Sequence, residues 1–309
     1  MNNTESQTAP FFSIVIPTYN REAYILNTLA SVFSQTFKSY EVIVVDNCST
    51  DQTELALAEL INSGKIKFIK HDKNYERAKS RNTGMKTAKG EFLTFLDSDD
   101  FMYPSNLQDA YDFIQSNQHS KIFYNLSEIV NEEKVRIRYS PPKHSSNAVE
   151  HISKGNFLSC IGDFIHKDVY TTILWDENPI LTGTEDYEYW LRVIAHFPKV
   201  GRINKVNNGI LEHASRSVNN DFIEKAKVRA DYMLKKIKED DYLSSVYHDR
   251  YFNNIKATLY VYISYMAKLA NNPNEMYKNL WIAVKSNNGL LLKRSTYTTL
   301  LLALLKKVI

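Results

Sequence analysis

Residues 90–100 read GEFLTFLDSDD, an apolar run that ends in a cluster of acidic side chains. Phe92–Asp97 has the length and composition of a strand that is buried on both faces. Two earlier stretches share this character, Phe11–Pro17 (FFSIVIP) and Tyr40–Asp46 (YEVIVVD). Because segments with helical spacing separate the three, they predict an α/β fold in which a mostly parallel sheet is flanked by helices.

The remaining elements follow from apolar spacing and from stop signals. Apolar residues recur on one helical face between Glu22 and Phe37, and Gly64 is placed to end a helix over Thr53–Asn62. Beyond these we expect strands at Ile66–His71, Lys121–Val130 and Lys134–Tyr139, helices at Arg77–Ala88, Leu107–Gln118 and Glu185–Ala195, a loop at Ser140–Ser153, and mostly helix from Asp221 onward with breaks near Asn271–Asn274 and Ser286–Gly289.

The composition excludes several classes of protein. Hydrophobic residues make up 43% of the 309 residues and charged residues 24%, which is typical of a globular chain and not of a disordered or collagen-like one. The two cysteines, Cys48 and Cys160, are too few for a disulfide framework or a four-cysteine zinc site. The first glycine is Gly64, so the N-terminal part has neither the GxGxxG loop of a dehydrogenase nor a Walker A loop.

Acidic residues follow two of the predicted strands. Asp97 and Asp99 are two residues apart in extended chain, so their carboxylates point to the same side and suit a hard cation such as Mg²⁺ or Mn²⁺. An acidic turn or helix N-cap is the alternative. Asp46 ends an apolar strand, where a carboxylate needs a hydrogen-bond donor, and the N–H groups of a nucleotide base can supply one. Ligands of such sheets bind beyond the carboxyl ends of the strands.

A third acidic group, Glu185 and Asp186, opens the expected helix EDYEYWLRV. Acidic side chains in a first turn stabilise a helix through its dipole. The functional interpretation is a general base, and the residues alone leave both open.

In combination, these features resemble glycosyltransferase family 2, whose enzymes have the GT-A fold. The matching stretches follow the family's order and approximate spacing between about residues 11 and 215. They are Ile14–Arg21 (IVIPTYNR), Val44–Thr53 (VVDNCSTDQT), Asn74–Gly84 (NYERAKSRNTG), Gly90–Asp100 (GEFLTFLDSDD), Asp176–Glu177 and Thr184–Arg192 (TEDYEYWLR). Three departures are Glu76, where the family often has Gly, Ser80, where it often has Ala, and Asn47, which replaces the second acid of a commoner Asp pair.

The resemblance implies an inverting enzyme that moves a sugar from a nucleotide diphosphate donor, with a UDP-sugar expected, to a hydroxyl of a glycan or lipid-linked acceptor in bacterial surface polysaccharide synthesis. It also implies Mn²⁺ or Mg²⁺ as cofactor. By this resemblance the catalytic base is Asp186, the metal ligands are Asp97, Asp99 and His213, and the donor-binding residues are Pro17, Thr18, Asn20, Asp46, Arg81, Asp97 and Asp99. A sugar nucleotidyltransferase, which normally has a Gly-rich phosphate loop, and a non-catalytic nucleotide-sugar-binding or scaffold protein are the alternatives.

We expect a GT-A domain over residues 1–220, with the nucleotide-sugar-binding half at about 11–105 and the acceptor half at 106–220. A helical region over 221–309 follows. This region is basic: residues 222–309 hold 15 Lys and Arg against 7 Asp and Glu, whereas the rest holds 23 against 28. Such asymmetry favours an anionic surface as partner, and a solvated helical face is the alternative.

The end of the chain, residues 290–309, reads LLLKRSTYTTLLLALLKKVI. Leucines flanked by basic residues are typical of an amphipathic helix on an anionic membrane surface. Packing on the core or on a second copy of the chain, as in a homo-oligomer, is the alternative. With no secretory signal and no apolar run of about 18 residues, we expect a cytoplasmic protein that is peripheral on the cytoplasmic face of the inner membrane. The net charge of +3 is too small to indicate nucleic-acid binding.

Overall fold

The structure, a computed structural model, describes residues 9–117, 120–139, 141, 145–213 and 223–292. The chain divides into two compact units. Unit 1 comprises Met1–Ser146, Leu158–Pro179 and Lys199–Arg216, and unit 2 comprises Asn147–Phe157, Ile180–Pro198 and Ser217–Ile309. Unit 2 therefore takes in two segments that precede the boundary expected at residue 220, and the domain limits stay a prediction.

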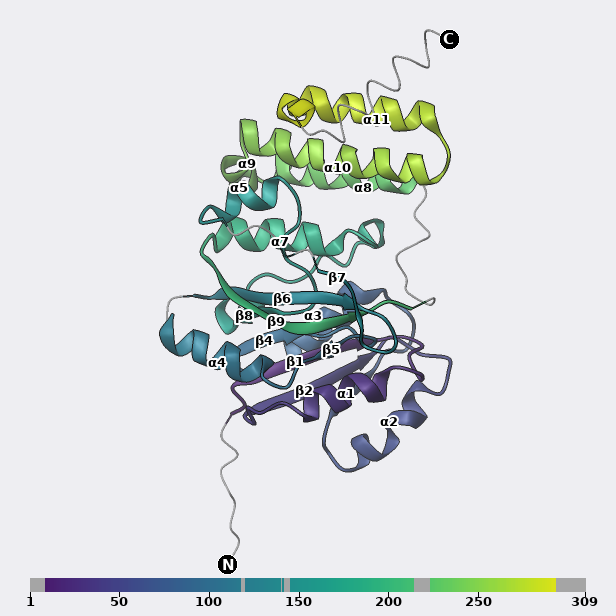
Figure 1. Ribbon diagram of the computed structural model, residues 1–309, viewed down its shortest axis with the longest axis vertical. Helices are drawn as coiled ribbons and strands as arrows, with labels where there is room; N and C mark the ends of the chain where they lie inside the picture. The colour runs from purple at the N-terminus through teal and green to yellow at the C-terminus, as the bar shows by residue number, and fades with distance from the viewer. Residues whose placement is uncertain (1–8, 118–119, 140, 142–144, 214–222, 293–309) are drawn as a thin grey trace, which may run out of the picture. The chain divides into compact units, whose positions relative to one another are not determined.

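Unit 1 contains a nine-stranded mixed sheet with the strand order β3-β2-β1-β4-β8-β6-β9-β5, and β7 pairs with β6 (Figure 1). The four strands β3, β2, β1 and β4 run parallel, as expected. Strand β8 is antiparallel to both β4 and β6, and β6 is parallel to β9. The strands are β1 (Phe12–Thr18), β2 (Tyr40–Asp46), β3 (Lys67–Lys70), β4 (Phe92–Phe95), β5 (Phe101–Met102), β6 (Ile122–Val130), β7 (Arg136–Arg138), β8 (Asp163–His166) and β9 (Val200–Leu211).

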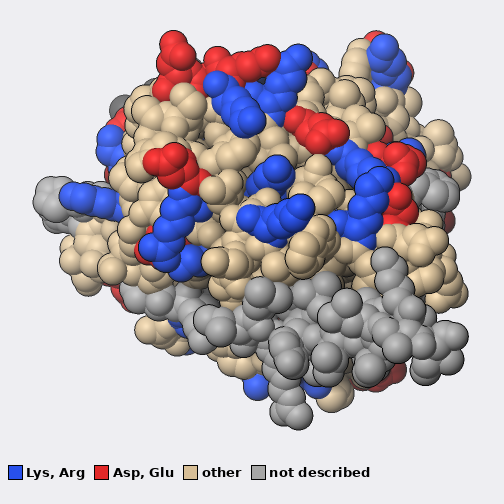
Figure 2. All heavy atoms as spheres, turned by 90° about the horizontal axis from the view of Figure 1, so that it is seen from above, with Lys and Arg blue, Asp and Glu red and all other residues tan. Residues whose placement is uncertain are grey.

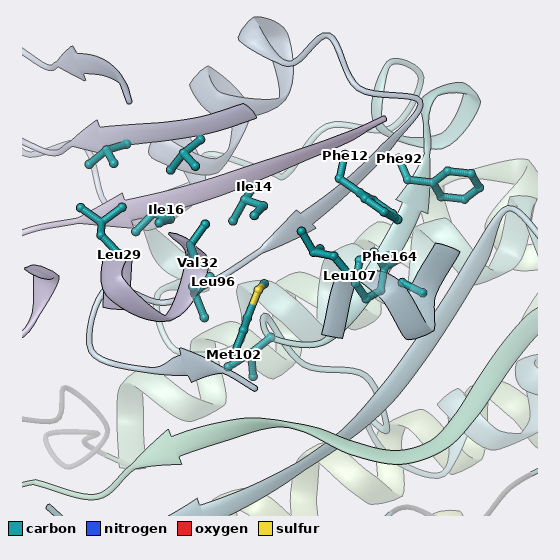
Figure 3. Packing of buried hydrophobic residues seen from close by; sticks show 14 of the residues in the cluster. Phe12, Ile14, Ile16, Leu29, Val32, Phe92, Leu96, Met102, Leu107 and Phe164 are labelled. Carbon is teal, nitrogen blue, oxygen red and sulfur yellow. The ribbon is translucent and has the colours of Figure 1, made fainter. Parts of the chain in front are cut away.

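Helices cover both faces of the parallel strands. Successive residues of a strand face opposite sides, and every residue of β1 is buried, so both faces need a covering layer. Phe12, Ile14 and Ile16 of β1 belong to a buried cluster with Leu29 of α1 and Leu107 of α4 (Figure 3). On the other face α3 packs so closely on β1 that a Cβ on its Gly84 would lie 2.2 Å from Val15 Cγ1. The helices of unit 1 are α1 (Ile25–Phe33), α2 (Thr53–Asn62), α3 (Arg77–Thr87), α4 (Asn106–Ser116) and α6 (Lys167–Tyr170).

The first helix is shorter than the sequence predicts. The expectation was Glu22–Phe37, whereas α1 spans Ile25–Phe33. At its start the backbone N–H of Arg21 donates to Thr53 Oγ1 (2.9 Å), so this segment forms a turn against the start of α2. Contacts with a distant loop thus decide where the helix begins.

Unit 2 is helical. The predicted breaks are confirmed, because α10 ends at Leu269, α11 starts at Pro273 and α11 ends at Ser286. The loop expected at Ser140–Ser153 is partly wrong: its last six residues form α5, with Asn147 Oδ1 accepting from the Glu150 backbone N–H (2.9 Å). The helices are α5 (Ala148–Ser153), α7 (Glu185–His196), α8 (Ile223–Glu239), α9 (Asp241–Val246), α10 (Asp249–Leu269) and α11 (Pro273–Ser286), and short 3₁₀ turns occur at Pro179–Leu181 and Asn288–Leu292.

Basic residues of unit 2 are partly neutralised. Lys227 Nζ lies 2.7 Å from Glu275, and Lys236 Nζ lies 2.7 Å from the buried carboxylate of Glu188. On the face that Figure 2 shows, Lys and Arg lie beside Asp and Glu, with wide areas of other residues between them. Most of the segment expected to contact the membrane, residues 293–309, lies outside the described residues. Within the described part of the chain, no helix combines the length and the hydropathy that a membrane crossing needs.

The close approach of Gly90 to β1 gives a test of the sheet. A Cβ at this position would lie 2.6 Å from the backbone N of Ser13 and 2.7 Å from the carbonyl carbon of Phe12. The residue is also held at its carbonyl oxygen, which accepts a hydrogen bond from the Tyr170 hydroxyl. We expect Gly90→Ala to lower the free energy of unfolding by about 1–3 kcal/mol, because backbone atoms must move apart. Urea unfolding measures this, with the exposed Lys89→Ala as control; equal stability of the two variants would contradict the packing.

Candidate functional site

The carboxyl ends of β1, β2 and β4 lie side by side at one edge of the sheet in unit 1. Thr18, the last residue of β1, pairs with Asp46, the last residue of β2. On its other side β1 pairs with β4, Val15 standing opposite Phe95. The segments that leave these strands are therefore neighbours, and they contain most of the predicted site residues.

Asp46 is fully buried, and its own loop supplies its donors. The backbone N–H of Ser49 lies 3.2 Å from both carboxylate oxygens, and the Ser49 hydroxyl donates to one of them. The Ser49 hydroxyl in turn accepts from the backbone N–H of Asn20 (2.9 Å). The donor that the sequence requires for this carboxylate is thus present within the chain.

Residues 17–20 form the strand end and turn that close over this loop. Asn20 has a φ of 52°, a left-handed conformation that Asn tolerates better than most residues. Its Oδ1 accepts from the backbone N–H of Thr50 (2.8 Å). Pro17 stands opposite Val45 in the sheet. The hydroxyl of Thr18 is buried and has no hydrogen-bond partner among the residues that the structure describes.

Asp99 meets two donors at a single oxygen. Arg21 Nε lies 3.0 Å and His213 Nε2 lies 3.2 Å from Asp99 Oδ2. The His213 side chain is fully buried and its ring lies against that of Tyr24, with centroids 4.4 Å apart. Two of the three predicted metal ligands are therefore in contact, although they are 114 positions apart in the sequence.

Asp97 faces a different cation. Arg81 Nη2 lies 3.4 Å from Asp97 Oδ1. The Arg81 guanidinium is buried and lies over the Trp175 ring, 4.6 Å from its centroid. Asn82 holds this arrangement, since its side chain bonds both the backbone N–H and the carbonyl of Trp175 (2.8 and 2.9 Å) and donates to Glu177 (2.8 Å). The matched pair Asp176–Glu177 thus lies next to the matched helix α3.

Asp100 is structural. Its side chain is buried, and one oxygen accepts from the backbone N–H of Leu211 (2.9 Å) at the end of β9. Its carbonyl accepts from the hydroxyl of Thr28 (2.8 Å) in α1. Because Leu211 precedes His213 by two residues, this bond helps to bring the histidine beside Asp99.

Asn47, the departure from the commoner acid, organises the neighbouring loop. Its Oδ1 lies 3.0 Å from His71 Nδ1 and accepts from the backbone N–H of Tyr75 (3.0 Å), and its Nδ2 donates to Asn74 (2.7 Å). The other ring nitrogen of His71 lies 2.9 Å from Thr83 Oγ1. Burial of the imidazole, with the ammonium of Lys79 as a second cause, lowers the pKa of His71 from its ordinary value of 6.5.

The predicted base, Asp186, lies in unit 2, in the first turn of α7. Its Oδ2 accepts from Asn156 Nδ2 (3.1 Å). The neighbouring Glu185 is buried and accepts from the backbone N–H of Gly183 (2.6 Å). Of the two acidic side chains, Asp186 is the more accessible to solvent.

Across the described residues, no group of three or more His, Cys, Asp and Glu side chains is arranged to hold a metal ion. His213 nevertheless lies in contact with Asp99, and the Asp97 carboxylate, 37% exposed, follows the same strand. Mg²⁺ is commonly bound by one or two carboxylates and completed by substrate phosphates. The residues present fit a divalent cation of that kind.

Sequence reasoning missed Arg21 and Ser49 as site residues. Both lie inside matched stretches, IVIPTYNR and VVDNCSTDQT, which is the one signal that points to them. Their role depends on contacts with Asp99 and Asp46, and those contacts appear only in the folded chain.

Comparison with known families decides the class. The profile described as glycosyl transferase family 2 matches residues 13–173, more than half of the chain. The chain belongs to glycosyltransferase family 2. The match starts at β1 and continues beyond β8, so it includes the strand ends that carry Asp46, Asp97 and Asp99. The resemblance that the sequence motifs indicate is confirmed.

Several curated relatives of this family member are similar over part of their length. WfgD of Escherichia coli, named a UDP-Glc:alpha-D-GlcNAc-diphosphoundecaprenol beta-1,3-glucosyltransferase, is 28% identical over 73% of this chain and 91% of that protein. TarS of Staphylococcus aureus, named a poly(ribitol-phosphate) beta-N-acetylglucosaminyltransferase, is 41% identical over 36% of this chain and 20% of that protein. An uncharacterized glycosyltransferase of Methanocaldococcus jannaschii is 26% identical over 60% of this chain and 66% of its own length, so the chain spans under two thirds of this relative and of TarS.

Solved structures agree on the fold. The structure of S. aureus TarS 1–349 in complex with UDP-GlcNAc has a TM-score of 0.67 at 23% identity, covering 89% of this chain and 81% of that one. A mannosyltransferase from Pyrobaculum calidifontis in complex with GDP-Man and Mn²⁺ has a TM-score of 0.59 at 15% identity, covering 94% of this chain and 83% of that one. The chain has the predicted GT-A fold with C-terminal helices.

The lowered pKa of His71 predicts a pH dependence of stability. Unfolding returns the imidazole to water, so between pH 6.5 and the lowered folded value the unfolded chain binds more protons. The free energy of unfolding contributed by this group is therefore fully present above pH 6.5 and falls as the pH drops through the folded pKa. We expect the melting temperature of His71→Gln to fall less on acidification than that of wild type. A control variant at the exposed His248, His248→Gln, is expected to show the same fall as wild type. If the melting temperatures of wild type and His71→Gln fell equally as the pH drops below 6.5, the lowered pKa of His71 would be contradicted.

Proposed function

We propose that the protein is an inverting, metal-assisted glycosyltransferase that moves a sugar from a nucleotide diphosphate donor, a UDP-sugar, to a hydroxyl of a glycan or lipid-linked acceptor. The observation that carries this proposal is the gathering of Asp46, at the carboxyl end of β2, with Asp97 and Asp99, which follow β4; both strands pair in parallel with β1. Parallel α/β sheets bind ligands at this edge. A structural relative described in complex with UDP-GlcNAc supports the choice of donor.

The donor side of the site is assigned residue by residue. The resemblance assigns Asp46 to the imide N–H of the base, and Ser49 bonds its carboxylate in the free protein. The Thr18–Asn20 turn borders the base. Asp97, steadied by Arg81, and Asp99 face the ribose and the diphosphate. These roles rest on the family resemblance and on the position of each side chain at the strand ends.

The cation is the finer part of the proposal. Asp97, Asp99 and His213 would hold Mn²⁺ or Mg²⁺, which supplies charge stabilisation to the departing nucleoside diphosphate. Guanidinium groups of Arg21 and Arg81 lie beside the two carboxylates and keep them from repelling each other in its absence. A relative described with Mn²⁺ supports this choice of metal.

Asp186 is proposed as the base that takes the proton of the acceptor hydroxyl as its oxygen attacks the anomeric carbon from the opposite face. Its carboxylate is partly exposed and is oriented by Asn156. For the acceptor, WfgD is named for a sugar linked to diphosphoundecaprenol, which supports a lipid-linked acceptor in bacterial surface polysaccharide synthesis. Peripheral contact with the cytoplasmic face of the membrane through 290–309, and a homo-oligomer, are further predictions.

Removal of the proposed base tests the mechanism. We expect Asp186→Asn to lower kcat by about 10²–10⁴-fold, because no general base then takes the proton of the acceptor hydroxyl. The melting temperature is expected to stay unchanged. The measurement is product formation from a panel of nucleotide sugars with the wild type and the variant. Asp241→Asn, an exposed acid in the first turn of α9, is the control. Near wild-type activity of Asp186→Asn would contradict the role, and NMR showing a retained anomeric configuration would contradict the direct displacement.

Donor binding is tested separately from turnover. A ligand that binds the native state raises the melting temperature. At a concentration a hundredfold above its Kd, it raises the free energy of unfolding by about 2.7 kcal/mol. We expect one UDP-sugar with Mn²⁺ to raise the melting temperature of the wild type and not of Asp99→Ala. A panel in which no nucleotide sugar shifts either protein would favour a site that needs its acceptor or a membrane first, or a non-catalytic scaffold protein.

A further inference from the structure

Asp99 differs from the other carboxylates of the site in what it already binds. Its Oδ2 contacts Arg21 Nε at 3.0 Å and His213 Nε2 at 3.2 Å, so one oxygen carries two nitrogen partners. The side chains of Asp99 and Arg21 are only 15% and 16% exposed. Asp97 is more open: Arg81 Nη2 lies 3.4 Å from its Oδ1, and 37% of its side chain is exposed. Of the two acids in the DSD motif, Asp99 is therefore the one with an oxygen already bonded to two side chains.

Two further hydrogen bonds hold Arg21 in this position. Its backbone N–H donates to Thr53 Oγ1 (2.9 Å), and its Nη1 donates to the carbonyl of Asn20 (3.1 Å). Asn20 is itself fixed by Ser49 and Thr50. The turn that packs on the Asp46 loop thus directs the guanidinium at Asp99.

We propose that Arg21 is an internal counter-cation that competes with the divalent cation for Asp99. This inference rests on the proposed function, because it concerns the proposed metal ligands. A guanidinium keeps its charge at any pH at which the protein is folded, so it neutralises Asp99 permanently in the free protein. A divalent cation that binds Asp99 Oδ2 must displace the Nε–H bond and overcome repulsion from the remaining positive charge. Arg21 therefore weakens metal binding until the diphosphate arrives with negative charge of its own.

The expected size of the effect follows from the behaviour of carboxylates beside cations. An arginine at this distance changes the proton affinity of a carboxylate by about one to three powers of ten. Removing the guanidinium is expected to raise the affinity for a metal cation by at least about tenfold by the same Coulombic argument. The direction is the informative part: a residue that only supported the shape of the site would lower metal affinity when removed.

The experiment measures binding of Mn²⁺ alone, with no nucleotide, by the EPR signal of the free ion. We compare wild type with Arg21→Gln, which removes the charge and keeps a side chain of similar length. The control is Lys121→Gln, which removes one positive charge from the ion pair with Asp168 (2.7 Å). Lys121 precedes β6 near the first residue of β4, at the end of the sheet opposite to Asp99.

We expect Arg21→Gln to bind Mn²⁺ about tenfold or more tightly than wild type, Lys121→Gln to match wild type, and Asp99→Asn added to Arg21→Gln to abolish the gain. Unchanged or weaker binding by Arg21→Gln, or absence of binding in both proteins, would overturn the inference. If Arg21→Gln fails to fold by circular dichroism, Arg21→Met decides, because it also removes the charge and keeps a side chain of similar length; a gain in affinity supports the inference and no gain overturns it. Failure of this test leaves the transferase proposal standing, since that proposal is judged by product formation.

Discussion

The parallel pairing of β1 with β2 on one side and with β4 on the other is the constraint on which the site depends. It brings three chain segments to one edge of the sheet and places Thr18 beside Asp46. The same pairing concentrates negative charge, because Asp46, Asp97 and Asp99 all follow these strands. Each carboxylate has a donor of its own, from Ser49, Arg81 and Arg21. The chain can therefore fold with the acids clustered and without any ligand.

The acidic run after β4 combines two different tasks within four residues. Asp97 and Asp99 are partly open to solvent, whereas Asp100 is buried and bonded to the backbone of Leu211. That bond joins the end of β9 to the segment after β4, and His213 follows two residues later. The position of the histidine beside Asp99 is thus a consequence of the anchor at Asp100. A motif that reads as one acidic cluster consists of two partly exposed side chains and a buried residue that positions their neighbour.

Much of the fold could be predicted from the sequence, and the failures have identifiable causes. The bounds of β2 and α2 agree with the prediction residue for residue, because an unbroken apolar run and a glycine stop are local signals. Strand β9 was not predicted, because VGRINKVNNGIL mixes polar residues and glycines with its apolar residues in no regular alternation. Its Asn207 and Asn208 are buried and are hydrogen-bonded to side chains of α4. A strand stabilised in this way has no alternation of apolar residues to reveal it.

The sequence by itself determined the family, the α/β class and the identity of the carboxylates at the strand ends, since these follow from the order of motifs and from local periodicity. The tertiary structure alone decided which donor each carboxylate has. Arg21 and Asp99 are 78 positions apart and His213 and Asp99 are 114 apart, so no spacing rule links them. An ion pair depends on where the backbone delivers two side chains in space, and that is settled by sheet register and by anchors such as Asp100. Periodicity reports the conformation of a segment and carries no information about its distant partners.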